Sequence, residues 1–119
     1  MEDGVTLKGH SSNTAPLVMV NSGGNLVLKD GGTISGNRGS AAASYSSYGG
    51  GVYVDGSGMF AKQSGGIIYG SNATSALKNI ANNGNAVYIS ASPAKIRNTT
   101  VGAGVTLDSA ASGSVVGWE

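Results

Sequence analysis

The sequence predicts an all-β fold, a right-handed single-stranded parallel β-helix (β-solenoid) of about three to five short turns that form one module over residues 1–119. Three observations lead to this prediction: a repeat of 34 residues, short strands with alternating apolar residues, and glycine-rich corners between them. Composition agrees with it. The chain has 21 glycines and an aromatic fraction of only 6%, so it suits a thin fold in which backbone ladders supply much of the cohesion.

The repeat is visible without gaps. Residues 17–37 align with residues 51–71 at a spacing of 34, so that Val18 matches Val52. A third copy begins 35 residues further on, where Val87 takes the same place. We therefore divide the module into repeats at about 15–48, 49–83 and 84–107, with a C-terminal cap at 108–119.

Each copy is expected to contain three short strands. The strands have β-branched or aromatic residues, and pairs such as Gly23-Gly24 and Gly31-Gly32 stand where the chain must turn. A half-copy precedes them at Val5–Leu7, and a trailing strand follows at Val105–Leu107. The segments between copies, 38–49 and 73–84, are expected to be loops. The pattern of the third copy becomes irregular from Pro93 to Ile96.

Winding in tiers would stack equivalent residues of successive copies in parallel, about 4.8 Å apart. The expected columns are Val18, Val52 and Val87 pointing inward, Val20, Val54 and Ile89 pointing inward, and Met19, Tyr53 and Tyr88 pointing outward. Leu26 and Phe60 are also expected to point inward. Lys62 aligns with Leu28, and we expect it to lean outward at the strand end, because a buried unpaired ammonium costs several kcal/mol.

Charge and cysteine content exclude several classes of protein. The net charge is +1 and the seven basic residues are scattered, which argues against a nucleic-acid partner. There is no cysteine, and hence no disulfide or thiolate metal site. No stretch reaches the roughly 20 apolar residues of a membrane span. The first residues do not resemble a signal peptide, so an export signal is expected outside this chain.

These glycine-rich motifs resemble those of bacterial cell-surface β-helix repeat proteins, with polymorphic outer-membrane adhesin-like repeats as more distant relatives. The resemblance rests on the segments 49–54, 32–37 and 60–72, and on a closing segment that ends at Gly117-Trp118-Glu119. It implies an extracellular or cell-surface address and a role in adhesion or wall architecture. Trp118 is expected to cover the end of the stack, and exposed ends predict end-to-end self-association.

No catalytic or metal site is predicted, and no cofactor. A glycosidase needs two carboxylates on one face, about 5 to 9.5 Å apart, and no two acidic residues occupy equivalent positions in the repeats. The acidic residues are Glu2, Asp3, Asp30, Asp55, Asp108 and Glu119. His10, the only histidine, has no triad partners at a recognisable spacing. We expect solvated corner residues and not an enzyme.

Three functions remain. The first is a non-catalytic structural or adhesive module of a bacterial surface or secreted protein, with a host or cell-wall glycan or protein as its partner. The second is a carbohydrate-binding module in which the outward Tyr53, Tyr88 and Met19 form the ligand-binding face, because aromatic faces stack on sugar rings. Alternatively, the same side chains bind no ligand and only stabilise their cross-strand neighbours. The third is a remnant of a polysaccharide lyase or hydrolase.

Overall fold

The computed structural model describes residues 4–38, 46–62 and 65–101. In these residues the chain is all-β, and no strand is longer than four residues. The strands are β1 (Thr6–Lys8), β2 (Val18–Val20), β3 (Asn25–Leu28), β4 (Thr33–Ser35), β5 (Ser46–Tyr48), β6 (Val52–Val54), β7 (Met59–Lys62), β8 (Ile67–Ile68), β9 (Ala81–Asn83), β10 (Val87–Ile89) and β11 (Lys95–Arg97).

Strands of successive repeats pair in parallel, as the alignment predicted. Val52 on β6 pairs with Val18 on β2 at one side and with Val87 on β10 at the other. β3 and β7 pair in the register Leu26 with Phe60. A strand is also present at the start, where a half-copy was expected: β1 pairs with β4 in the register Thr6 with Thr33, and β4 pairs with β8. Apart from β1 and β4, whose partners are 27 residues apart, these strands pair at offsets of 34 or 35 residues, as the alignment of the copies predicts.

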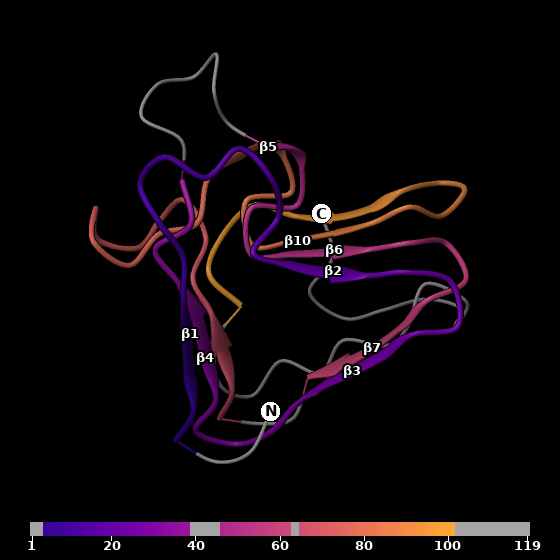
Figure 1. Ribbon diagram of the computed structural model, residues 1–119, viewed down its shortest axis with the longest axis horizontal. Helices are drawn as coiled ribbons and strands as arrows, with labels where there is room; N and C mark the ends of the chain where they lie inside the picture. The colour runs from indigo at the N-terminus through magenta and orange to yellow at the C-terminus, as the bar shows by residue number, and fades with distance from the viewer. Residues whose placement is uncertain (1–3, 39–45, 63–64, 102–119) are drawn as a thin grey trace.

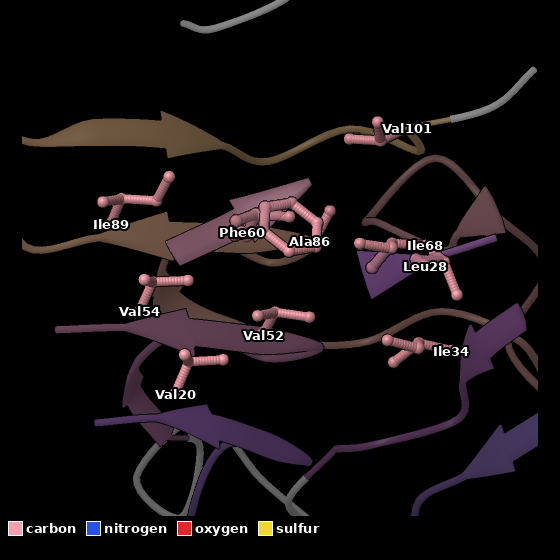
Figure 2. Packing of buried hydrophobic residues seen from close by; sticks show 11 residues of the cluster. Val20, Leu28, Ile34, Val52, Val54, Phe60, Ile68, Ala86, Ile89 and Val101 are labelled. Atoms are coloured by element: carbon pink, nitrogen blue, oxygen red, sulfur yellow. The ribbon is translucent and has the colours of Figure 1, made fainter. Parts of the chain in front are cut away.

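The core lies between three of the sheets. Figure 1 shows β1 and β4 side by side, β3 beside β7, and β2, β6 and β10 together, with the three groups facing one interior. The alternation of the strands sends one set of side chains inward: Figure 2 shows Val20, Val54 and Ile89 one above another from successive strands. The buried apolar residues are Val20, Leu28, Ile34, Val52, Val54, Phe60, Ile68, Ala81, Ala86, Val87, Ile89 and Val101.

The prediction of a right-handed single-stranded parallel β-helix is wrong. The described residues form four separate small sheets of two to four strands, and the largest is mixed, in the order β11-β10-β6-β2. β11 runs antiparallel to β10, with Val87 opposite Arg97. The physical reason lies in the connection: five residues join the two strands, whereas a parallel return needs a crossover of about a dozen or more. Val101 likewise forms an antiparallel bridge with Ile68.

The two segments expected to be loops hold a further sheet. β5 and β9 pair in parallel, with Ser46 opposite Ala81 and Tyr48 opposite Asn83. These strands consist of serine, tyrosine, alanine and asparagine and lack the apolar alternation that marks a strand in sequence. Their partners lie 35 residues apart, so the repeat extends into segments where composition gave no signal.

Lys62 does not lean outward. Its side chain is buried, with 1% of its surface exposed, and its strand keeps the register in which Lys62 lies opposite Leu28. Phe60 and Lys62 share one face of β7, because side chains two residues apart on a strand point the same way. Burial lowers the pKa of the Lys62 amine, and the nearby Asp30 carboxylate partly opposes that shift. Lys62 is therefore buried because β7 keeps its register with β3, although burying the amine costs free energy.

Candidate functional site

The outward column is present as a row of neighbouring side chains. Tyr53 on β6 lies in register between Met19 on β2 and Tyr88 on β10. Met19 has 56% of its surface exposed, and both tyrosines are half-buried. Inward-pointing valines flank Met19 and Tyr53 along their strands, and Val87 and Ile89 flank Tyr88, so the packing of the core fixes the direction of the column.

The tyrosine rings contact one another. The rings of Tyr53 and Tyr88 are stacked, with centroids 5.9 Å apart and planes 7° from parallel. Tyr48, at the end of β5, lies against Tyr88 at 4.8 Å with a tilt of 46°. Offset stacking and tilted contacts are the arrangements that aromatic pairs prefer. Tyr88 is therefore engaged by two rings, which supports the interpretation that it stabilises its neighbours.

A hollow of about 500 Å³ opens beside the part of the column that Met19 and Tyr53 form. It is lined by Thr14, Ala15, Pro16, Met19, Asn21, Ser46, Ser47, Tyr48, Tyr53 and Asp55. Its volume lies in the range of ordinary ligand pockets, roughly 300–1,000 Å³, and its wall combines aromatic and apolar groups with a few polar ones, as such pockets do. Tyr53 and Met19 belong to this wall, whereas Tyr88 does not.

Two of the polar groups occupy equivalent positions in successive repeats. Asn21 follows Met19 by two residues, and Asp55 follows Tyr53 by two. Both residues directly follow their strands, and both line the hollow together with Met19 and Tyr53. The Asp55 amide donates to the Val20 carbonyl over 2.8 Å, which continues the β2–β6 ladder to this point. An apolar pair and a polar pair thus lie next to each other in the hollow.

Asp55 carries the charge of the hollow. Among the described residues its carboxylate hydrogen-bonds only with Ser57, from the amide at 3.3 Å and the hydroxyl at 3.4 Å, both to Oδ1. These are long bonds and therefore weak ones. The sequence indicated a solvated corner residue, and the structure instead places it half-buried at the wall of the hollow.

Buried asparagines hold one wall of the hollow in place. The Asn37 side chain donates to the carbonyls of Ala15 (2.9 Å) and Gly50 (2.7 Å), and it accepts from Asn13 Nδ2 at 2.8 Å. The amide of Asn37 in turn donates to Asn79 Oδ1 over 3.0 Å. The segment before β2 is thus fixed to the core through amide groups. Sequence reasoning did not single out these residues, because their partners lie 13 to 42 positions away.

The described carboxylates and the histidine do not assemble into a second site. Asp30 lies exposed between β3 and β4, and His10 bonds to the nearby Ser12 hydroxyl at 2.8 Å. The described residues hold no group of three or more His, Cys, Asp or Glu that could bind a metal ion. The predicted strand at Val105–Leu107 and the predicted cap with Trp118 lie outside the described residues, as do the remaining acidic residues.

Comparison of the chain with known protein families, with curated proteins and with solved structures finds no match. Across the described ranges no helix has the length and apolar character needed to cross a bilayer.

Proposed function

We propose that this chain is a non-catalytic adhesive module of a bacterial surface or secreted protein and that its ligand is a carbohydrate. The observation that carries the proposal is the hollow beside Tyr53, where aromatic and apolar side chains stand next to hydrogen-bonding groups. A sugar ring presents the complementary arrangement, because its C–H faces are apolar and its rim carries hydroxyls. Tyr53 and Met19 offer the apolar surface, and Asn21 and Asp55 lie beside it.

The contacts between the rings change which residues we assign to the ligand-binding face. Of the three residues that the sequence indicated, Tyr53 and Met19 line the hollow, while Tyr88 contacts two other rings. Tyr48 takes the place of Tyr88 in the wall and has 47% of its surface exposed. We assign ligand contact to Tyr48, Tyr53 and Met19, and to Tyr88 the role of holding the rings of Tyr48 and Tyr53.

The proposed location, at the bacterial cell surface or outside the cell, is supported by the glycine-rich motifs. Segments such as 49–54 resemble the repeats of bacterial surface proteins, in which repeated β modules present faces for adhesion. A wall of short parallel strands suits that role because side chains of successive repeats come into register, and three strands suffice to align Met19, Tyr53 and Tyr88.

A glycan array probed with the chain and with single variants tests the proposal. The unchanged chain is expected to bind at least one glycan, and Tyr53→Ala and Tyr48→Ala are each expected to weaken binding tenfold or more, about 1.4 kcal/mol. Met59→Ala is the matched control. Met59 is an exposed side chain on β7 that does not line the hollow, so its removal is expected to leave binding unchanged.

Two results would contradict the proposal. One is a chain that folds and binds no glycan. The other is binding that neither tyrosine substitution weakens, while circular dichroism shows that both variants retain the fold.

A further inference from the structure

We propose that the saccharide bound in the hollow is an amino sugar with a free, protonated amine, recognised by the Asp55 carboxylate. This inference rests on the proposed function, because it names the class of carbohydrate that the same hollow takes. The juxtaposition that carries it is a half-buried carboxylate beside an apolar and aromatic surface.

The first step concerns the charge. Of the described residues that line the hollow, Asp55 alone is charged. Its hydrogen bonds with described residues are the two long ones with Ser57, both at Oδ1, so Oδ2 is available to a ligand. A carboxylate that binds an ammonium forms a charge-assisted hydrogen bond, roughly twice as strong as a neutral one. A cationic ligand complements this wall better than a neutral or an acidic one.

The second step concerns the distance between the two surfaces. Asp55 directly follows β6, two residues after Tyr53, and both line the hollow. The bond from the Asp55 amide to the Val20 carbonyl keeps the backbone extended to this point, and at about 3.3 Å per residue the two side chains start about 6.6 Å apart. One pyranose ring spans that distance with its amine substituent. The ring would lie against Tyr53 and Met19, while the amine on its edge reaches the carboxylate.

The third step separates an amino sugar from a simple ammonium ion. Sites for quaternary ammonium groups surround the cation with several aromatic faces, whereas here Tyr88 stacks on Tyr53. The remaining wall carries Thr14, Asn21 and Ser47, whose polar groups suit the hydroxyls of a sugar. The residues that line the hollow thus complement a polar ring that bears one positive charge.

A matched pair of ligands tests the inference by isothermal titration calorimetry on the full chain. The probes are oligomers of glucosamine and of N-acetylglucosamine with equal length and linkage, at about pH 6, where the free amine is protonated. The glucosamine oligomer is expected to bind at least tenfold more tightly. Asp55→Asn is expected to reduce this preference to twofold or less, because the amide has the same shape without the charge. Tyr53→Ala is expected to weaken both oligomers.

Asp30→Asn is the matched control, since Asp30 is an exposed corner carboxylate that does not line the hollow. Its substitution is expected to preserve the preference. Equal affinity for the two oligomers would overturn the inference, and so would a preference that survives Asp55→Asn, or choline bound more tightly than either sugar. In the first two cases the proposed function stands. A chain that binds neither oligomer nor any glycan of the array would overturn the proposed function itself.

Discussion

The side chain of Asn79 ties the repeats together, and replacing it tests whether buried amides hold this fold. Asn79 is fully buried. Its Oδ1 accepts the Asn37 amide at 3.0 Å, and its Nδ2 donates to the carbonyls of Tyr69 (2.7 Å) and Ile34 (3.1 Å). Asn79→Ala removes all three bonds and leaves the backbone in place.

The expected loss in the free energy of unfolding depends on which hydrogen bonds each partner of Asn79 still makes in the variant. The Tyr69 carbonyl still accepts the Asn79 amide, and the Ile34 carbonyl still accepts the Tyr69 amide. The loss of these two bonds therefore costs about 1 kcal/mol each. The Asn37 amide is left unpaired in the interior, at about 2 kcal/mol. The expected decrease in the free energy of unfolding is about 4 kcal/mol, a large share of the 5–15 kcal/mol of a typical domain.

Urea unfolding followed by circular dichroism measures this decrease. Asn83→Ala is the control: Asn83 is exposed and its side chain donates one bond of 3.2 Å, to the Ser47 carbonyl, so the loss in stability is expected to stay within about 0.5 kcal/mol. Asn79→Asp is expected to destabilise at least as much as the alanine at neutral pH, because it places a carboxylate opposite two carbonyls. A decrease below about 1 kcal/mol for Asn79→Ala would refute the reasoning.

Three further predictions concern the core and the rings. Burial lowers the pKa of Lys62, so between that pKa and the ordinary value of 10.5 the unfolded chain binds more protons than the folded one, and stability rises with pH. Lys62→Met is therefore expected to raise the free energy of unfolding by about 1 kcal/mol at neutral pH. This gain over the parent is expected to shrink as the pH rises toward 10.5. A difference in the free energy of unfolding that stays the same at every pH, measured by urea unfolding, would contradict this. Gly50→Ala places a Cβ 2.5 Å from the Asn85 carbonyl oxygen and is expected to cost about 1–3 kcal/mol; a loss below about 0.5 kcal/mol in thermal melts would count against the packing argument. Tyr88→Leu is expected to cost about 1–2 kcal/mol through its two ring contacts, and a double-mutant cycle of Tyr53→Leu and Tyr88→Leu should show a coupling of at least about 0.5 kcal/mol; additive losses would mean that the stacking contributes nothing.

The strand register could be predicted from the sequence. Val18, Val52 and Val87 recur at nearly constant spacing with the same alternation, and backbone pairing brings such residues together wherever successive repeats lie in parallel. The spacing also brought Met19, Tyr53 and Tyr88 into one outward column. Lys62 followed the same rule against expectation, because the ladder between β3 and β7 fixes the direction of its side chain.

The candidate site was only partly predictable. Tyr53 and Met19 could be found from their outward positions, whereas the contacts of Tyr88 could not, because they depend on Tyr48, which lies in a segment without strand pattern. Asp55 was judged a solvated corner residue. Its place in the wall depends on the segment before β2, which Asn37 holds from 22 residues away at the Ala15 carbonyl.

By itself the sequence determined an all-β chain, the pairing partners of its apolar strands, and which side chains face outward, because periodicity and spacing encode local direction and register. Only the tertiary structure decided that β11 turns back against β10, that β5 and β9 form a sheet of their own, and that Asp55 borders a hollow. These features depend on the length of a connection and on hydrogen bonds between groups far apart in the chain, and neither leaves a repeating pattern in the residues.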